Sequence, residues 1–481
     1  MSNSQGNAHR KEPTLDAKPL LQRMNFDNVR DTPYVAPPEP PVRYTPWLLL
    51  LLALLLTIAL YQESRNHFYQ SALWHWYSSK LSYQITTGPS DSINYPAAGP
   101  FDQRFGYSQL PLWQDKLSQA GFAISAQSQF SDALLRYTNM GFTAPYTEKN
   151  AAGLSINGCN AEPLLQNRSP ALQFQQLQQI APIIVKSLLF VEDRSLLTPD
   201  HVSANPVLNL PRLGAAALSQ LQRAAGIPAA AAGGSTLATQ LEKYRHSPQG
   251  YTSDISDKFR QLVSASVRSY QQGVDTSVSR QKIVLDYINT VPLSATSSYG
   301  EVNGMGEGLY AWFGASPVAV NQLLQQSAPY TDEHGQALKQ VLALIIAQRR
   351  PSYYLLQGRN DLEQLINRHL NLMQQQQVLP AELAQKALSQ KLQFSATAAP
   401  LNGQVADYKA VNLVRNRLAQ LLDVNLYQLD RFDLNSTTTL NIPLQRTISQ
   451  HLRQLNQQPA AEQAGLFGDR LLSPGQQSKV K

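Results

Sequence analysis

Residues 233–244 read GGSTLATQLEKY, and this stretch carries the strongest functional signal in the chain. Two glycines end a loop, and Ser235 and Thr236 are residue types that cap a helix beginning just after them. The free backbone N–H groups at such a helix start favour a phosphate or diphosphate. Gln240 and Lys243 are three residues apart, so they share one helix face and both can reach a ligand. An ordinary capped helix with a solvated lysine gives the same pattern, and this alternative stays open.

A second polar cluster precedes this stretch. The segment FVEDR at residues 190–194 places Glu192 and Asp193 at the end of an apolar helix. A carboxylate backed by apolar side chains is suited to act as a general base. The alternative is a helix end that meets solvent, where the positive charge of Arg194 is favourable.

A third cluster, DKFRQ at residues 257–261, opens another predicted helix. Lys258 and Arg260 are two cations near the predicted anion-binding helix, and they suit a diphosphate leaving group. Taken alone, the same residues would form a solvated helix face.

The pattern around these clusters is helical almost throughout residues 168–400. Segments with a 3.6-residue apolar period include IAPIIVKSLLFVED, RLGAAALSQLQRAAG and SRQKIVLDYIN. Before this block, residues 100–167 combine a helix at residues 111–122 with strands around Asn157-Gly158, a turn signal typical of a hairpin. After it, residues 401–481 mix helical and strand patterns. The chain is therefore predicted to be mostly α, with a small α+β module before the helical block.

The N-terminal part predicts a membrane anchor. Residues 46–61 form an apolar run that only Thr57 interrupts, and the 18 residues 44–61 would span roughly 27 Å as a helix, barely a bilayer core. Trp47 and Tyr61 lie at the two ends, where amphipathic rings favour the membrane interface. A cleaved signal peptide is the alternative, but the preceding leader is longer than usual and no small-x-small cleavage site follows closely.

The leader, residues 1–43, predicts the orientation of this anchor. It holds six basic residues and a Pro-rich end, so we expect a disordered tail that stays in the cytoplasm by the positive-inside rule. Residues 62–99 then form a connector on the other side, and residues 62–481 lie outside. This layout predicts a single-pass protein of the bacterial inner (cytoplasmic) membrane whose main body is periplasmic.

Composition excludes several classes of protein. With 481 residues, 43% hydrophobic, the chain has too much core-forming material to be disordered throughout. A single cysteine excludes a disulfide framework and a multi-cysteine metal site, and the eight histidines show no metal-binding spacing. Glycine-rich nucleotide motifs are missing, so no organic cofactor is expected. The net charge of +7 is spread along the chain, which fits a membrane or an anionic ligand and does not indicate nucleic acid.

Taken together, the order of these clusters resembles the peptidoglycan glycosyltransferases, the transglycosylase domains of class A penicillin-binding proteins. The first motif of that family begins with Glu-Asp, and its second, Gly-x-Ser-Thr-x-x-x-Gln-x-x-Lys, is matched by residues 233–243. Its third, Arg-Lys-x-x-Glu, falls on residues 257–261. Its later motifs, Ile-Leu-x-x-Tyr-x-Asn and Tyr-Phe-Gly, are approximated at residues 283–289 and 312–314. The chain thus resembles a divergent member of this family over about residues 180–375.

The resemblance implies a lysozyme-like, two-lobed glycosyltransferase domain over residues 168–400. Residues 100–167 resemble the small regulatory module that some Gram-negative members place before that domain. Residues 401–481 resemble the linker that leads into a transpeptidase domain. The motif set of a transpeptidase is absent from this sequence, so a partial bifunctional protein and a single-activity protein both stay open.

The resemblance also implies a reaction. The family polymerises lipid II: the acceptor's sugar 4-hydroxyl attacks the donor's anomeric carbon with inversion, and polyprenyl pyrophosphate leaves. Glu192 matches the family's general base. The residues expected to bind substrate and pyrophosphate are Gly234, Ser235, Thr236, Gln240, Lys243, Lys258, Arg260 and Gln261, and the expected supporting residues are Asp193, His201 and Asn289.

Further ligands and partners follow from the same resemblance. Mg²⁺ or Mn²⁺ is the expected cofactor, although no dedicated metal site is predicted. The expected partners are lipid II, the growing glycan strand, the membrane, and an activator protein or other cell-wall synthases.

The sequence departs from the family pattern at several positions. Gln261 stands where the family has its second glutamate, and glutamine offers a metal ion no negative charge. Thr239 replaces the first glutamine of the second motif, and the first motif lacks its glycine near His201. Two alternatives therefore stay open: a catalytically silent homologue that binds lipid II or glycan and scaffolds cell-wall synthesis, and an envelope protein unrelated to lipid II.

Overall fold

The computed structural model describes residues 45–96, 99–150, 152–167, 172–208, 235–297, 299–395, 408–455 and 457–466, with the single residues 219 and 222. The chain divides into two units, residues 1–58 and residues 59–481. The leader predicted for residues 1–43 lies outside the described residues, as do residues 396–407 of the predicted linker.

The described part of the first unit belongs to helix α1 (Thr45–Asn66), which continues into the second unit. Its leucines are exposed, from Leu48 at 62% to Leu60 at 61%. The stretch Trp47–Asn66 has 20 residues and is long and apolar enough to cross a membrane, by length and composition. An apolar helix that packs against no protein requires another apolar environment, so this helix fits a membrane-anchored protein. It runs five residues beyond the predicted end at residue 61.

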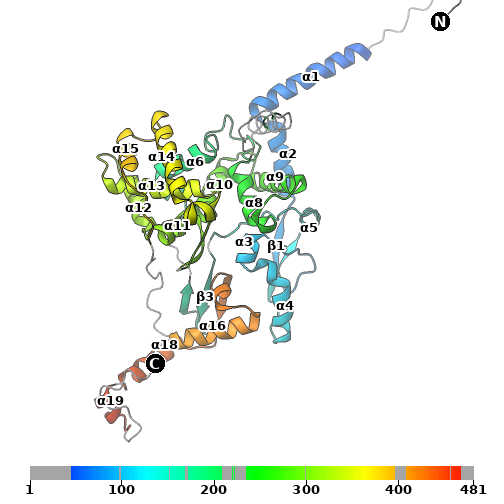
Figure 1. The fold of residues 1–481 in the computed structure, drawn as a ribbon. Helices are drawn as coiled ribbons and strands as arrows, with labels where there is room; N and C mark the ends of the chain where they lie inside the picture. Colours follow the sequence, from blue (N-terminus) through cyan, green and yellow to red (C-terminus); the bar gives the residue numbers. More distant parts are fainter. Residues whose placement is uncertain are drawn as a thin grey trace, which may run out of the picture. The chain divides into compact units, whose positions relative to one another are not determined.

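The second unit is mostly helical, as the sequence predicts (Figure 1). The larger helices of its N-terminal and middle parts are α2 (Phe68–Ser79), α4 (Leu110–Gln119), α5 (Asp132–Asn139), α6 (Pro182–Glu192), α8 (Leu237–His246), α9 (Ile255–Ser269), α10 (Ser277–Thr290) and α11 (Gly304–Phe313). Further along lie α12 (Pro317–Gln325), α13 (Asp332–Ala347), α14 (Arg359–Gln375), α15 (Ala381–Ser389), α16 (Tyr408–Leu422), α18 (Ile442–Gln454) and α19 (Gln458–Gln463). Short helical turns are α3 (Pro100–Arg104), η1 (Tyr107–Gln109), η3 (Leu177–Gln179), η4 (Pro248–Gly250), η5 (Tyr353–Gln357) and α17 (Leu426–Leu429).

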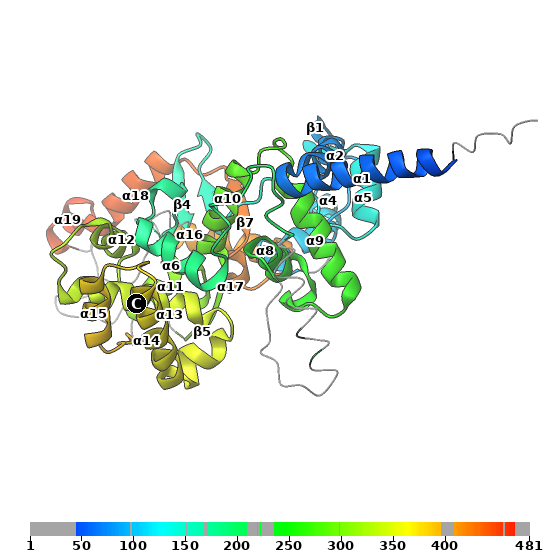
Figure 2. The same cartoon turned by 90° about the horizontal axis from the view of Figure 1, so that it is seen from above.

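Helix α13 forms the centre of the main core. Its sequence from Ala337 to Ala347 is apolar on nearly every side, and a helix with that pattern is stable only when it is surrounded. Helices α6, α11, α12, α14 and α15 pack around it (Figures 1 and 2). Every residue of α13 from Ala337 to Ala347 is buried.

The described residues also form three small sheets. Strands β1 (Tyr83–Thr87) and β2 (Ala126–Phe130) are antiparallel, as are β5 (Pro292–Thr296) and β6 (Gly300–Asn303). The third sheet has the order β4-β3-β7, from β3 (Gly153–Asn157), β4 (Pro163–Asn167) and β7 (Asp433–Thr437). The hairpin predicted at Asn157-Gly158 is present as β3 and β4, with residues 158–162 as its loop.

The segments on either side of the helical block share structure with each other and with the block. Strand β3 pairs in parallel with β7, so residues 153–157 and 433–437 lie in one sheet. Trp113 of α4 packs in the same small core as Phe432. Leu134 of α5 instead packs with Val267 of α9. The predicted boundaries at 100–167 and 401–481 stay predictions, and both segments contribute to a joint core.

A buried cluster of charges ties the segment before the block to α8 and α9. Glu148 accepts from Arg245 Nη1 at 2.6 Å, and its other oxygen lies 2.7 Å from His246 Nε2 and 3.1 Å from Arg268 Nη2. Asp102 of α3 lies 3.1 Å from His246 Nδ1. Burial disfavours charge here, but Arg268, His246 and Arg245 hold the pKa of Glu148 well below its usual value. Losing one partner would leave an uncompensated buried charge, so the cluster fixes the segment in place.

This cluster predicts an alkaline loss of stability. Burial lowers the pKa of His246, but Glu148 and Asp102 outweigh it and raise that pKa from 6.5 to about 10. A folded-state pKa above the unfolded one gives stability that is complete below pH ~6.5 and is lost as pH rises towards about 10. We expect His246→Gln to lower the unfolding free energy by roughly 3 kcal/mol at pH 6 and by almost nothing at pH 10.

Chemical denaturation of the detergent-solubilised chain at both pH values measures this difference. The exposed His451 of α18 supplies the control His451→Gln, which should match the wild type at both pH values. An equal loss from His246→Gln at pH 6 and pH 10 would contradict the assignment of a charged histidine.

Candidate active site

Glu192 occupies the last position of α6. The helix starts with Pro182 in its first turn, where a missing N–H costs nothing, and buries Ile184 and Leu188 in the main core. The chain leaves the helix at Asp193, whose backbone φ is −158°. The apolar face of α6 thereby fixes the backbone of Glu192, whose residue is 8% exposed.

Two side chains from distant parts of the chain hold the Glu192 carboxylate, and a third orients one of them. Gln240 Nε2 of α8 donates to Glu192 Oε2 at 3.1 Å, and Arg349 Nη2 donates to Glu192 Oε1 at 3.3 Å. Tyr287 of α10 donates its hydroxyl to Gln240 Oε1 at 3.1 Å. Burial and the Glu192 charge raise the pKa of Tyr287 well above its usual value, so this hydroxyl keeps its proton. The donor orientation of Gln240 towards Glu192 is thereby fixed.

Two lysines lie together beyond Gln240. Lys258 Nζ of α9 donates to Ser235 Oγ at 3.0 Å. Burial lowers the pKa of Lys258, and the nearby charge of Lys243 lowers it further. Within the described ranges, neither lysine forms an ion pair with a carboxylate. Two half-buried positive charges without a carboxylate partner in the described part of the chain favour an anionic ligand at this place.

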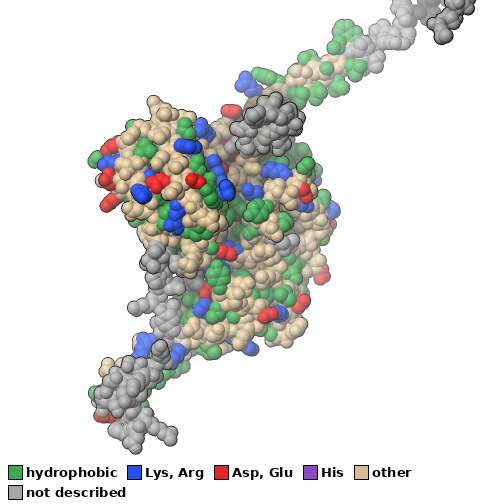
Figure 3. All heavy atoms as spheres, viewed as in Figure 1, with side chains coloured by type: hydrophobic (Ala, Val, Ile, Leu, Met, Phe, Trp, Pro, Cys, Tyr) green, Lys and Arg blue, Asp and Glu red, His purple; other side chains and the backbone are tan. Residues whose placement is uncertain are grey.

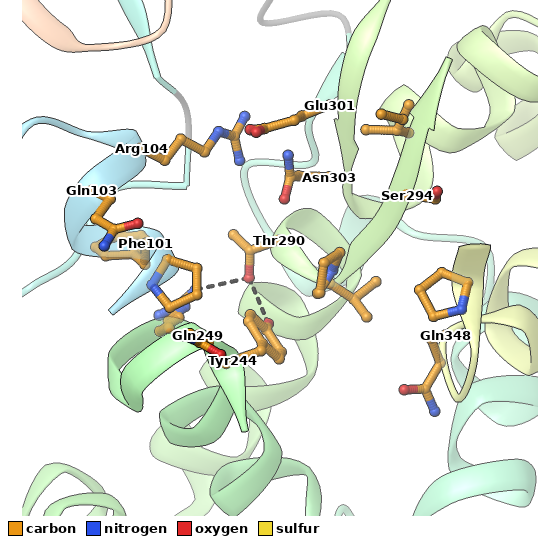
Figure 4. Close-up of a pocket in the computed structure, with 18 of the residues that line it drawn as sticks. Phe101, Gln103, Arg104, Tyr244, Gln249, Thr290, Ser294, Glu301, Asn303 and Gln348 are labelled. Carbon is orange, nitrogen blue, oxygen red and sulfur yellow. Dashed lines mark hydrogen bonds between the residues drawn. The ribbon is translucent and has the colours of Figure 1, made fainter. Parts of the chain in front are cut away.

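A cavity of about 1130 Å³ opens beside these groups. Gln240, Lys243 and Arg349 line it, so it reaches the side chains that hold Glu192 and one lysine of the pair. Lys and Arg side chains stand on both sides of the hollow in Figure 3. Figure 4 shows Tyr244 and Thr290 at one wall, where their hydroxyls are 2.7 Å apart.

Five of the predicted site residues therefore gather here: Glu192 and Gln240 at the carboxylate, and Ser235, Lys243 and Lys258 at the anion end. Thr236 is the N-cap of α8 and is 1% exposed, and it donates to the backbone oxygen of Val207 at 3.3 Å. Thr236 thus positions the start of α8, as the capping pattern predicts. Gly234 lies outside the described residues.

The other predicted residues have different neighbours. Arg260 pairs with Asp257 on its own helix. The hydrogen bond from Ser253, followed by that from Arg260, lowers the pKa of Asp257 to about 2. Gln261 is buried and donates to Ser247 Oγ and Thr252 Oγ1, both at 2.9 Å. Its amide thereby secures the loop after α8, and the structure does not bring it to Glu192.

The three predicted supporting residues are also placed. Asn289 donates to the backbone oxygen of Phe174 at 2.7 Å and accepts from its N–H at 3.0 Å. His201 accepts from the backbone N–H of Ser203 at 3.2 Å, in the loop after α6. Asp193 is buried and its charge acts on Arg280, which donates to backbone oxygens of the same loop. All three therefore support backbone near the site.

Sequence reasoning missed Arg349. It follows the apolar helix α13 within the segment QRRP, residues 348–351. Two consecutive arginines follow a fully buried helix and precede a proline, which ends the helical pattern. Such arginines are expected where the chain leaves the core, so their charges can face a site there. That signal could have marked Arg349 as a candidate site residue. It could not have identified its partner Glu192, which lies 157 positions away in the chain.

The prediction of Mg²⁺ or Mn²⁺ stays a prediction. Among the residues that the structure describes, no group of three or more His, Cys, Asp or Glu side chains could hold a metal ion. Glu242 is paired with Arg268, and Asp257 with Arg260, so neither substitutes for the glutamate that Gln261 replaces. These residues do not fit a protein-held metal, and no step below passes through one.

One comparison with known proteins found a match. Residues 161–377 match the family model described as Transglycosylase. None of the curated proteins compared with the chain matches it. The matched range includes Glu192, Gln240, Lys243, Lys258 and Arg349, and the match supports a member of the peptidoglycan transglycosylase family.

Proposed function

We propose that the chain polymerises lipid II into glycan strands. The transglycosylase domain supports peptidoglycan glycosyltransferase activity in general. The observation that carries the specific proposal is the Glu192 carboxylate, which is held by Gln240 and Arg349. Both of these side chains line a cavity that Lys243 also lines, and the charge of Lys243 acts on the neighbouring Lys258. One carboxylate and one cationic pocket are what a single inverting displacement needs.

Glu192 is the proposed general base. It takes the proton from the 4-hydroxyl of the acceptor sugar while that oxygen attacks the anomeric carbon of the donor. The bond between that carbon and the pyrophosphate oxygen breaks, and its electron pair leaves with the pyrophosphate. Gln240 and Arg349 orient the carboxylate, because each holds one of its oxygens.

Lys243 and Lys258 are the proposed binding groups for the leaving pyrophosphate. Negative charge grows on that group as the bond breaks, and preorganised cations stabilise it most strongly where water is excluded. Ser235 supplies a hydroxyl at the same place, since it already accepts from Lys258.

The rest of the layout follows from the substrate. Lipid II keeps its lipid in the membrane, so an anchor at α1 would keep the site near it, with the N-terminus cytoplasmic and the main body periplasmic in the inner membrane. The growing glycan strand is the second ligand, and an activator protein or other cell-wall synthases are the proposed protein partners. The segments 100–167 and 401–481 are proposed as regulatory and linker parts of this enzyme.

A silent homologue is the second candidate, and Gln261 favours it. Its amide is used by Ser247 and Thr252, and it offers no negative charge. Such a protein would bind lipid II or glycan without joining sugars. An assay of strand formation by the wild type separates the two candidates.

Replacing the base tests the proposed reaction. Glu192→Gln keeps the size of the side chain and removes its ability to take a proton. We expect strand formation to fall by about 10²- to 10⁴-fold while lipid II binding stays within about twofold. Gel analysis of strands made from labelled lipid II measures the first, and titration with lipid II in detergent measures the second.

The exposed Glu333 at the start of α13 supplies the control Glu333→Gln, which should leave both quantities unchanged. Unchanged strand formation by Glu192→Gln would contradict the role of Glu192. Lipid II bound by a wild type that forms no strands would support the silent homologue.

Lys258 predicts the alkaline limit of the activity. Its pKa is lowered from 10.5, by burial and by Lys243, and only the protonated lysine stabilises the pyrophosphate. As pH rises, Lys258 therefore loses its proton earlier than a lysine of ordinary pKa, and activity should fall at that lower pH. Lys258→Arg keeps its charge and should move this alkaline limb to higher pH in a pH–rate profile.

The exposed Lys409 provides the control Lys409→Arg, whose profile should follow that of the wild type. An alkaline limb that stays in place in Lys258→Arg would show that another group sets it.

A further inference from the structure

We infer that the segments flanking the transglycosylase domain form a binding site for an uncharged sugar chain, the backbone of the glycan strand. These segments are residues 100–109 and 427–432, which lie outside the matched range 161–377 and line the same cavity. We call their lining side chains the flanking wall. The inference rests on the proposed function and adds residues that the family match does not cover.

The flanking wall is closely packed against the domain. A Cβ built on Gly300 of β6 would lie 2.5 Å from Arg431 Nη2 and 2.7 Å from the Tyr427 hydroxyl, and Gly300 has φ +89°. The backbone N–H of Glu301 donates to the Tyr427 hydroxyl at 3.2 Å. A Cβ on Gly99 would lie 2.2 Å from the backbone oxygen of Arg245. Because the backbone approaches so closely at Gly99 and Gly300, each segment is held in place against the domain. The side chains of both segments therefore belong to the cavity wall.

The charges of the flanking wall are balanced by nearby carboxylates. Arg104 lies 3.5 Å from Glu307, and the charge of Arg431 also acts on Glu307, whose pKa burial raises. Glu301 adds a second carboxylate to the lining. Figure 4 shows Arg104 pointing towards the strand that carries Glu301 and Asn303. The two arginines of the flanking wall therefore have carboxylates close to them, in contrast to the pair Lys243 and Lys258.

The remaining side chains of the wall suit hydroxyl groups. Gln103, Ser108, Gln109 and Gln428 are neutral and polar, and Asn303 of β6 lines the same cavity. An amide offers both donors and an acceptor, which matches sugar hydroxyls that donate and accept at once. Among the residues described, Gln109 has no hydrogen bond from its side chain, so its amide is available to a ligand.

An exposed aromatic ring completes the wall. Tyr427 is 47% exposed although it lines the cavity, and Arg431 stacks on its ring at 3.7 Å from the centroid. An amphipathic ring of this kind offers an apolar face to sugar C–H groups beside a polar rim. The cavity of about 1130 Å³ exceeds the roughly 300–1,000 Å³ of ordinary small-ligand pockets, so a chain of several sugars has room.

Binding of two simple probes to the detergent-solubilised full chain tests this inference. The β-1,4-linked hexamer of N-acetylglucosamine is uncharged and probes the flanking wall, whereas inorganic diphosphate probes the lysine pair. Gln109→Ala removes one amide, and we expect about fivefold weaker binding of the hexamer, as one hydrogen bond is worth about 1 kcal/mol. Tyr427→Ala should weaken it by at least about tenfold, and Tyr427→Phe, which keeps the ring, should recover most of this loss.

Diphosphate binding should be unchanged in all three variants and lost in Lys258→Ala. The exposed Gln119 on α4 gives the matched control Gln119→Ala, which should bind the hexamer like the wild type. Diphosphate binding by the variants also shows that they are folded.

The outcomes separate this inference from the proposed function. A wild type that polymerises lipid II or binds diphosphate, yet binds no hexamer or binds it equally in the Gln109 and Tyr427 variants, would overturn the sugar site alone. A wild type that binds the hexamer through these residues and forms no strands would support the site and remove the polymerase proposal.

Discussion

The hydrogen bond from Gln240 to Glu192 joins the two parts of the chain that the proposed chemistry needs. Gln240 lies on α8, and Glu192 ends α6, whose apolar face belongs to the main core. Tyr287 fixes the amide of Gln240, and Arg349 holds the second carboxylate oxygen. Because α8 also carries Lys243, one helix sets the spacing between the base and the cationic end of the cavity. Any change in the position of α8 would therefore move both at once.

Contacts at the C-terminal end of α8 hold this helix in position. Arg245 and His246 enter the buried charge cluster around Glu148, to which α3 contributes Asp102 and α9 contributes Arg268. Pairing of these charges offsets the cost of burying them, and the helix, the preceding segment and α9 are held together. The same α3 then lines the cavity through Gln103 and Arg104. The cluster thus connects the support of the site with the wall that the flanking segments add.

Sequence patterns predicted the local features of this arrangement well. The cap at Thr236, the apolar face ending at Glu192, and the shared face of Gln240 and Lys243 are short-range features, and the structure contains them. Each depends on spacings of a few residues along one helix, which a sequence displays directly. The mostly helical class and the apolar helix near the N-terminus follow from patterns of the same kind.

Long-range pairings could not be predicted in the same way. Arg349 reaches Glu192 across 157 positions, and β3 pairs with β7 across the whole helical block. Arg260 and Gln261 were expected at the pyrophosphate, but the turn of α9 directs Arg260 to Asp257, and Gln261 secures a loop. Lys258 alone of that motif joins Ser235. Which face of a helix meets the cavity depends on packing that only the fold supplies.

The central claim is that Glu192, Lys243 and Lys258 act together on one substrate bound at the cavity. A structure of the detergent-solubilised chain bound to lipid II tests it most directly. The account predicts the diphosphate within hydrogen-bond distance of Lys243 and Lys258, with the attached sugar beside Glu192. Lipid II bound with its diphosphate away from both lysines, or with its sugar out of reach of Glu192, would contradict the account.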